Sequence, residues 1–239
     1  MKNLWQKQYS LRASDFDRFN NIKPSAILDL FQDAAGQHAE ELGVGFEDML
    51  KRGYLWVLTR VKFDILLLPA RYQDVVVKTW PLEPNRLNYR REYCIEDICG
   101  NRLVKGSSEW VVIDSKERRF LSVPDLYPFK DGFHNEIMYD GKFKKVRDFK
   151  AQNPPHPVNV CFNDLDLNGH VNNIRYANYV FDAINPEVPR CVKSFQIDYR
   201  KEVLQGTELK IYYENQENAI AAKGQSGDDV MFACFVEFN

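Results

Sequence analysis

Residues 164–184 read DLDLNGHVNNIRYANYVFDAI, a polar stretch that becomes apolar towards its end. The pair Asn168-Gly169 is a strong turn signal, because both residue types tolerate a positive φ. After the turn, apolar residues recur at spacings of three and four, which predicts a helix from about Asn172 to Ile184. The stretch therefore predicts a polar turn at the N-terminal end of a partly buried helix.

The beginning of the chain has a similar order of residues, since residues 15–34 read DFDRFNNIKPSAILDLFQDA. An Asp-x-Asp pair again precedes Asn-Asn-Ile and an amphipathic segment. We expect a helix over Pro24–Leu42, with the proline in its first turn and Gly43 just past its end. The two stretches indicate a duplicated unit, with chance matching as the alternative.

Segments rich in Val, Ile, Trp and Tyr follow the first helix and are separated by turn residues. These strands are expected at Leu55–Leu67, Asp74–Leu82, Asn88–Ile95 and Leu103–Ile113. Later, Asp198 and Glu208–Ile211 repeat Asp64 and Asp74–Val77 at a shift of 134 positions. The sequence therefore predicts an α+β fold built from two units, each a helix wrapped by an antiparallel sheet.

Residues 124–156 have a different texture, with prolines, glycines, charges and scattered aromatics but no period. We interpret them as a connector that crosses the surface and is held there by its aromatic side chains. The predicted division is an N-terminal unit at residues 1–123, a connector at 124–156 and a C-terminal unit at 157–239.

Composition limits the classes of function. Apolar residues make up 44% of the 239 residues and charged residues 28%, as in globular proteins with a sizeable core. The net charge of -2 argues against a general nucleic-acid binder, and no apolar run approaches the ~18 residues of a membrane span. The five cysteines are an odd number without CxxC spacing, which argues against a zinc site and against a disulfide framework. We therefore expect reduced thiols and a cytoplasmic protein.

The two copies differ where polar residues gather. Between Asp17 and Asn20 the first copy has only two residues, whereas Leu167–Val171 fills the same gap in the second copy. At the 134-residue shift, Glu202 corresponds to Leu68. We therefore expect the second copy to carry the chemistry and the first copy to bind.

The polar turn suits stabilisation of a negative charge. Side-chain donors of Asn168 and His170 beside the N–H groups of a helix N-terminus would form an oxyanion hole for a carbonyl under attack. Each residue also has a structural explanation: His170 as a buried hydrogen-bonded histidine, Asp164 and Asp166 as turn carboxylates, and Asn172 or Asn173 as a helix cap. The combination favours acyl chemistry, which needs a base and positioned donors together.

A second polar cluster lies in residues 197–209, IDYRKEVLQGTEL. Asp198, Arg200 and Glu202 alternate along a predicted strand, so we expect them to share one face of a sheet. That face is either a solvated row of charges or, with Glu202 directed towards His170, the site of a general base for water.

These residues resemble the acyl–acyl carrier protein (ACP) thioesterases that end fatty acid synthesis in plant plastids and some bacteria. The resemblance rests on Asp-x-Asn-x-His-Val-Asn-Asn, starting at Asp166, joined to the Tyr-Arg-Lys-Glu that ends at Glu202. The segments Tyr54–Ile65, Asp74–Pro81 and Tyr89–Asp114 look like characteristic strands of the same family. The likeness covers almost the whole chain except the connector.

The resemblance implies two hotdog folds in tandem and hydrolysis of the thioester between a fatty acyl chain and the phosphopantetheine arm of ACP. It implies that residues 1–123 bind the acyl chain and that residues 157–239 hold the catalytic positions, Asp166, Asn168, His170 and Glu202. No cofactor, metal, nucleic acid or membrane insertion is implied. A homodimer is left open, as are acyl chain length and saturation.

One position departs from the family pattern. The plant enzymes usually have a cysteine directly after the glutamate, once proposed as a nucleophile, but this chain has Val203. A thiol there cannot be essential, so Glu202 either activates water, which we favour, or attacks as a carboxylate. Strand-like sequence begins by about Tyr9, so no plastid transit peptide is expected, which suits a bacterial-type cytoplasmic enzyme.

Other functions remain open at this stage. An acyl-coenzyme A thioesterase would use the same chemistry. A non-catalytic acyl-binding hotdog protein would have no need for a group of buried polar residues. A hotdog dehydratase is disfavoured, because the motif contains no separate dehydratase signature. If the partner is the acidic ACP, basic residues should contact it. The candidates are Arg86, Arg90, Arg91, Lys142, Lys144, Lys145 and Arg147.

Overall fold

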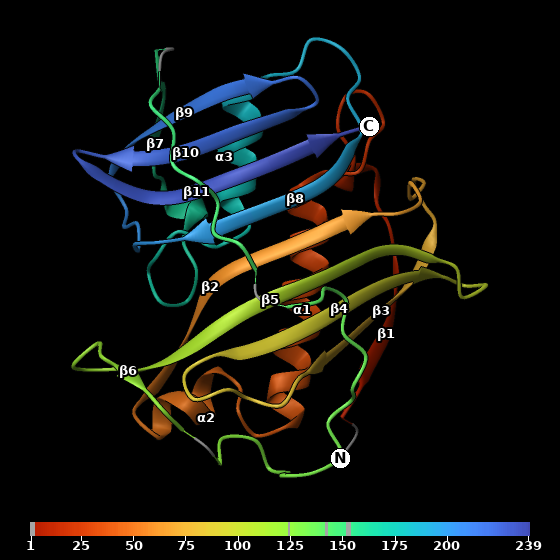
Figure 1. Cartoon of the computed structure of the whole chain (residues 1–239), viewed down its shortest axis with the longest axis vertical. Coiled ribbons are helices and arrows are strands. Elements are labelled where there is room, and N and C mark those ends of the chain that lie inside the picture. Colours follow the sequence, from red (N-terminus) through yellow and green to blue (C-terminus); the bar gives the residue numbers. More distant parts are fainter. Residues whose placement is uncertain (1–2, 124, 142, 152–153) are drawn as a thin grey trace. The chain divides into compact units, whose positions relative to one another are not determined.

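The computed structural model describes residues 3–123, 125–141, 143–151 and 154–239 (Figure 1). It divides into two compact units, the first made of residues 1–13 and 29–141 and the second of residues 14–28 and 142–239. Each unit contains an antiparallel sheet with helical residues packed on it. The α+β class predicted from the sequence is confirmed.

The sheet of the first unit has the strand order β1-β3-β4-β5-β2, with β6 paired to β5, and every pairing is antiparallel. The strands are β1 (Trp5–Ser10), β2 (Tyr54–Ile65), β3 (Asp74–Pro81), β4 (Tyr89–Asp97), β5 (Arg102–Asp114) and β6 (Phe120–Leu121). The four strands expected from the sequence are all present, with their ends displaced by at most two residues. The short helix α2 (Phe46–Lys51) was not expected.

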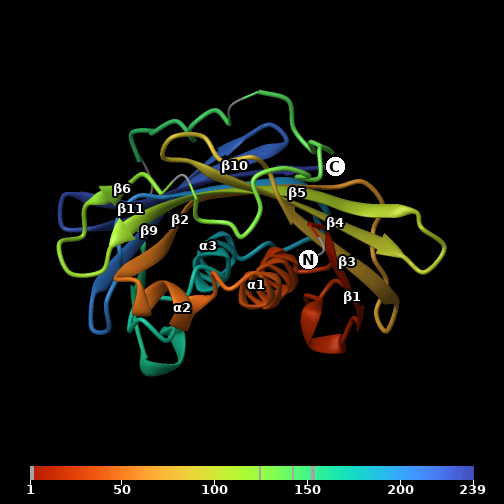
Figure 2. The ribbon, with the colours of Figure 1, turned by 90° about the horizontal axis from the view of Figure 1, so that it is seen from below.

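Helix α1 (Pro24–Glu41) ends two residues before Gly43, whose φ of 66° reverses the chain as expected. In the first unit, the residues of α1 lie against β4 and β5 (Figure 2). The Phe31 ring stacks on Tyr93 with the centroids 4.3 Å apart. Gly106 on β5 makes this approach possible, since a Cβ there would lie 2.3 Å from the Phe31 ring.

The opposite face of this sheet is covered by part of the connector. On β4, Arg90 and Glu92 alternate with the α1-facing residues and therefore point to that opposite face. Glu92 is fully buried and accepts a hydrogen bond from the Met138 N–H at 3.1 Å, and Arg90 donates to the carbonyls of Tyr139 and Gly141. Burial raises the pKa of Glu92, against the opposing effect of the Arg90 guanidinium.

The sheet of the second unit has the antiparallel order β8-β11-β10-β9-β7. The strands are β7 (His156–Asn159), β8 (Val192–Tyr199), β9 (Glu208–Gln216), β10 (Ala219–Ser226) and β11 (Asp229–Phe238). Helix α3 (Arg175–Ile184) packs on it through Tyr176, whose ring lies 5.0 Å from Phe232 and 5.4 Å from Tyr199. The helix begins three residues later than predicted.

The connector also crosses the sheet of the second unit. The Val146 N–H donates to Asp198 at 2.8 Å, and the buried Lys223 ammonium contacts Asp148 at 2.8 Å. In each unit, a buried carboxylate on a strand, Glu92 or Asp198, thus accepts a hydrogen bond from a backbone N–H of the connector. Buried polar groups therefore hold the connector, in addition to the aromatic rings expected from the sequence. Its residues 124, 142, 152 and 153 lie outside the described residues.

Within the described part of the chain, no helix is long and apolar enough to cross a membrane.

Candidate active site

The polar turn of residues 166–170 is closed by one side chain. Asp166 Oδ1 accepts the N–H groups of Asn168, at 2.8 Å, and His170, at 3.2 Å. The Asp166 N–H donates to the His170 carbonyl at 2.8 Å, and Gly169 has the φ of 75° that the sequence predicted for this turn. Asp166 therefore fixes the backbone that carries Asn168 and His170.

The beginning of the chain forms the same turn. Asp17 Oδ1 accepts the N–H groups of Phe19 and Asn21, both at 2.8 Å, and the Asp17 N–H donates to the Asn21 carbonyl. Asn20 has a φ of 66°, so it corresponds to Gly169.

This correspondence corrects the expected difference in turn length. The two turns have equal length; Phe19 stands where the second copy has Asn168, and Asn21 where it has His170. The sequence comparison was wrong because it aligned the two Asn-Asn pairs, which occupy different positions of the turn. The first copy lacks the amide and the imidazole, not the turn itself.

Glu202 lies beyond the end of its strand. β8 ends at Tyr199, and the N–H groups of Arg200 and Lys201 both donate to the Met231 carbonyl, at 2.9 and 3.1 Å. Two residues opposite one partner form a bulge, which breaks the alternation of side chains. The prediction that Asp198, Arg200 and Glu202 share one strand face is therefore wrong for Glu202.

The bulge allows Glu202 to approach His170. The His170 Nε2 and Glu202 Oε2 atoms are 3.4 Å apart, and the two side chains are 24% and 43% exposed. The backbones beside them run antiparallel, since His170 bridges to Leu204 and the Val171 N–H donates to the Val203 carbonyl at 2.8 Å. A carboxylate and an imidazole thus face each other at a site open to solvent.

The other two predicted residues have different surroundings. Asn168 is exposed on the turn directly before this pair, with its N–H held by Asp166. Asp166 acts on the backbone and not on the imidazole side chain in the hydrogen bonds observed. The structure therefore brings His170 and Glu202 together, with Asp166 holding the turn beneath them and Asn168 on its exposed side.

Asp164 fixes the turn to the start of α3. Arg175 donates to its Oδ1 through both Nε, at 2.8 Å, and Nη2, at 2.7 Å, while the Cys161 N–H donates to its Oδ2 at 2.9 Å. Burial opposes ionisation of Asp164, but these hydrogen bonds outweigh it and hold its pKa below the ordinary value. Asn172 Oδ1 accepts the Ile174 N–H at 3.1 Å, which delays the helix to Arg175.

The sequence did not single out Tyr176, a buried residue in the first turn of α3. Burial raises the pKa of its hydroxyl, and the negative charges of Asp166 and Glu202 raise it further. The Tyr176 hydroxyl therefore stays protonated. Its place in the apolar stripe of the helix made it look like an ordinary core residue.

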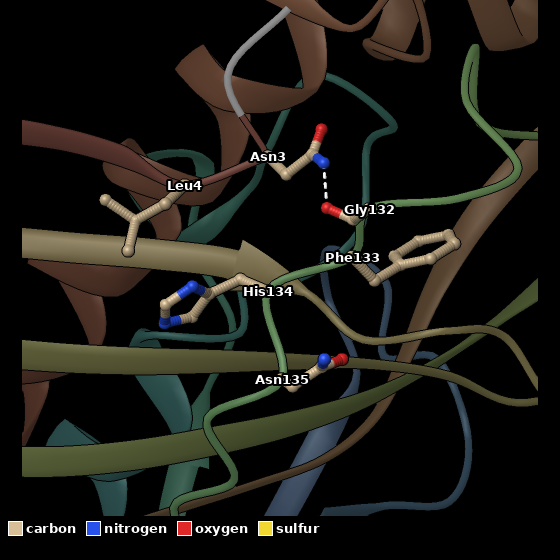
Figure 3. Close-up of a pocket in the computed structure, with 6 residues that line it drawn as sticks. All are labelled: Asn3, Leu4, Gly132, Phe133, His134 and Asn135. Carbon is tan, nitrogen blue, oxygen red and sulfur yellow. Dashed lines mark hydrogen bonds between the residues drawn. The ribbon is translucent and has the colours of Figure 1, made fainter.

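A surface hollow of about 540 Å³ belongs to the first unit and involves none of the predicted catalytic residues. It is lined by Asn3, Leu4 and residues 132–135, and the Asn3 amide donates to the Gly132 carbonyl (Figure 3). A second pocket of this unit, of about 290 Å³, has a floor of Tyr89, Tyr127, Phe129 and Phe133. Among the described residues, no cluster of His, Cys, Asp and Glu could hold a metal ion.

Comparison with known proteins agrees with the motif. The family model described as "Acyl-ACP thioesterase N-terminal domain" matches residues 2–128, and "Acyl-ACP thioesterase C-terminal domain" matches residues 147–228. A palmitoyl-acyl carrier protein thioesterase of Cuphea hookeriana is 27% identical over 214 residues, covering 83% of this chain and 52% of that protein. An oleoyl-acyl carrier protein thioesterase of Coriandrum sativum is 28% identical over 219 residues, covering 83% and 59%. The chain spans about half the length of the curated relatives it matches.

Solved structures confirm the tandem double hotdog fold. An acyl-ACP thioesterase from Bacteroides thetaiotaomicron VPI-5482 matches with a TM-score of 0.88 at 23% identity, covering 99% of this chain and 98% of the other. A 12:0-ACP thioesterase from Umbellularia californica matches with a TM-score of 0.86 at 21% identity, covering 100% and 98%. The two family models together extend over most of the chain, and the protein belongs to the acyl-ACP thioesterase family.

Proposed function

We propose that this protein hydrolyses the thioester of a fatty acyl-ACP, releases the free fatty acid and thereby ends chain elongation. The observation that carries the proposal is the 3.4 Å approach of His170 Nε2 and Glu202 Oε2 beside a turn held by Asp166. The names of the relatives support the same substrate class. No cofactor or metal takes part in the proposed reaction.

In the proposed mechanism, Glu202 acts as the general base. It takes a proton from a water molecule while the water oxygen bonds to the thioester carbon, and His170 orients that water. Negative charge develops on the former carbonyl oxygen, which the Asn168 amide and a backbone N–H of the turn stabilise. The C–S bond then breaks, and the departing thiolate takes the proton that Glu202 gained, either directly or relayed through His170.

A cysteine nucleophile has no place in this scheme. The position after Glu202 holds Val203, which is fully buried and offers no nucleophilic atom. Tyr176 supports the base by keeping a protonated hydroxyl close to the Asp166 and Glu202 carboxylates. Water activation by Glu202 is the version of the mechanism that we favour over direct attack by the carboxylate.

We further propose that residues 1–123 bind the acyl chain and that residues 157–239, after the connector at 124–156, supply the catalytic groups. An apolar cluster in the first unit supports the first assignment: Leu42, Met49, Tyr89, Val112 and Tyr127 are buried together, with further aromatic residues packed against them. The aromatic floor of the 290 Å³ pocket belongs to this cluster.

The carrier protein is the proposed partner. Two of the expected contacts are unavailable to it, since Arg91 is buried and Arg90 binds connector carbonyls. Arg86, Lys144, Lys145 and Arg147 are exposed and remain the candidates, while Lys142 lies outside the described residues. A cytoplasmic location and a homodimer stay proposals that rest on composition and on the family alone.

The test compares kcat/KM for the same acyl group carried by ACP and by coenzyme A. A separate assay measures binding of the free fatty acid. Hydrolysis of acyl-ACP with a clear preference over acyl-coenzyme A supports the proposal. The reverse preference makes the protein an acyl-coenzyme A thioesterase. Binding of acyl ligands without any thioester cleavage makes it a non-catalytic acyl-binding protein.

A further inference from the structure

Three exposed apolar side chains lie on the segments that carry His170 and Glu202 or lead to them. Phe162 is 78% exposed, Leu167 is 89% exposed and Leu204 is 55% exposed. Leu167 directly precedes Asn168 in the turn, the backbone of Leu204 bridges to His170, and Phe162 opens the short helical turn that leads to Asp164. We call these three residues the apolar rim.

The first copy of the repeat has no His–Glu pair, so its residues can be compared with the apolar rim at the equivalent positions. Its short helical turn Ala13–Asp15 and its Asp17 turn repeat Phe162–Asp164 and the Asp166 turn, so Ala13 corresponds to Phe162 and Arg18 to Leu167.

Two further pairs of hydrogen bonds fix the third correspondence. Tyr72 N–H donates to the Leu11 carbonyl as Gly206 N–H does to Val160, and Gln73 N–H donates to Ala70 as Thr207 N–H does to Leu204. Ala70 therefore corresponds to Leu204. At all three positions the bulky apolar residue occurs only in the copy that carries His170 and Glu202.

The fold therefore does not require these exposed side chains. Exposed apolar groups bordered by polar ones mark surfaces that bind a ligand or partner. Because Leu167 and Leu204 adjoin the residues that face the thioester, whatever covers them lies next to the sulfur atom.

The charges near the apolar rim indicate which part of the substrate it binds. Asp166 directly precedes Leu167 and Glu202 lies two residues before Leu204, while Arg175 is paired with Asp164 at 2.7 Å and Lys201 with Asp229 at 2.6 Å. An acidic protein surface is repelled from such a place. The arm next to the sulfur is uncharged, with two amides and a geminal dimethyl group, and carries its charge only at the distant phosphate.

We infer that Phe162, Leu167 and Leu204 bind the neutral pantetheine portion of the substrate arm and thereby position the thioester between His170 and Glu202. The inference rests on the proposed thioesterase function. On this inference the apolar rim binds the part of the substrate that leaves as the thiol. It also explains why Leu167, which is 89% exposed, lies in the turn beside Asn168.

Binding of non-hydrolysable ligands tests this without requiring turnover. The probes are a dodecyl-pantetheine thioether and a dodecyl thioether of N-acetylcysteamine, which lacks the dimethyl group and the second amide, both below their critical micelle concentrations. Calorimetry on the full chain should show a Kd for the pantetheine thioether about tenfold higher in Leu167→Ser/Leu204→Ser, the order expected for losing two partly buried leucine side chains. The Kd of the shorter thioether should rise by a smaller factor, because this ligand keeps only the part of the arm next to the sulfur.

A matched control accompanies the variant. Val188→Ser removes a 61% exposed side chain beyond the C-terminal end of α3. It should bind the two thioethers as the wild type does. An unchanged Kd in the double rim variant, or an equal loss for both thioethers, would overturn the inference.

Kinetics separates the arm from the carrier protein. If the rim binds the arm, the double variant loses kcat/KM equally on acyl-ACP and acyl-pantetheine. A loss confined to acyl-ACP means that the rim contacts the carrier protein, and the inference is then wrong. If the wild type binds the pantetheine thioether through the rim yet cleaves no thioester, the proposed function fails while the binding site stands.

Discussion

Glu202 Oε2 lies 3.4 Å from His170 Nε2, although the strand that leads to Glu202 ends at Tyr199. The bulge at Arg200 and Lys201, both bonded to the Met231 carbonyl, releases Glu202 from the face that Asp198 occupies. The approach of the carboxylate and the imidazole therefore depends on a local irregularity of the sheet.

Replacing the proposed base should remove most of the activity. In Glu202→Gln, kcat should fall by ~10²–10⁴, because the amide cannot take a proton from water while its size is kept. Single-turnover hydrolysis of acyl-ACP by protein free of wild type measures this. Glu208→Gln, which alters another exposed carboxylate of the same unit, serves as the control. Turnover close to that of the control would rule out Glu202 as the base.

Asn168→Ala should lower kcat by ~10²–10³ with little change in KM, because the amide is proposed to act on charge that develops only in the transition state. Asn163→Ala, at another exposed position in the short helical turn before Asp164, is the control. Steady-state kinetics of both variants provides the comparison. A rise in KM with an unchanged kcat would instead assign Asn168 to ground-state binding.

The duplicated turn provides a matched pair for Asp166. Asp166→Ala and Asp17→Ala each remove a carboxylate that accepts two backbone N–H groups, so each should lower the free energy of unfolding by about 1–3 kcal/mol. Only Asp166→Ala should also reduce kcat, since only its turn carries Asn168 and His170.

Urea unfolding and kinetics on the same preparations test both parts. An equal loss of kcat in the two variants would show that the effect on activity comes from general destabilisation.

Asp164 should stabilise the fold in a pH-dependent way. The pKa of Asp164 is lower in the folded protein than in the unfolded chain, where it is about 4. The contribution of Asp164 to the free energy of unfolding is therefore fully present above about pH 4. It is lost as the pH falls from there towards the pKa of the folded state. The difference in unfolding free energy between wild type and Asp164→Asn should therefore be constant from about pH 5 to pH 7 and shrink below about pH 4. A difference that grows on acidification would contradict the assigned direction.

Much of this protein was determined by local sequence. The spacing of apolar residues in Pro24–Glu41, the Asn-Gly pair at Asn168 and the alternating strands of the first unit each express a preference that neighbouring residues impose. The same reasons explain why the α+β class and four strands could be predicted, while the four candidate residues stay a prediction. The motif around His170 also identified the family, because its residue types and spacing are specific.

Tertiary structure decided what local preference leaves open. The bulge that aims Glu202 at His170 depends on Met231, which is distant in sequence and presents one carbonyl to two N–H groups. The equal length of the Asp17 and Asp166 turns appears only in their hydrogen bonds, since no residue identity marks Asn20 as the partner of Gly169. Likewise, Leu167 reads as an ordinary apolar residue until its exposure is known. Contacts between residues far apart along the chain set these features, and a one-dimensional pattern does not record them.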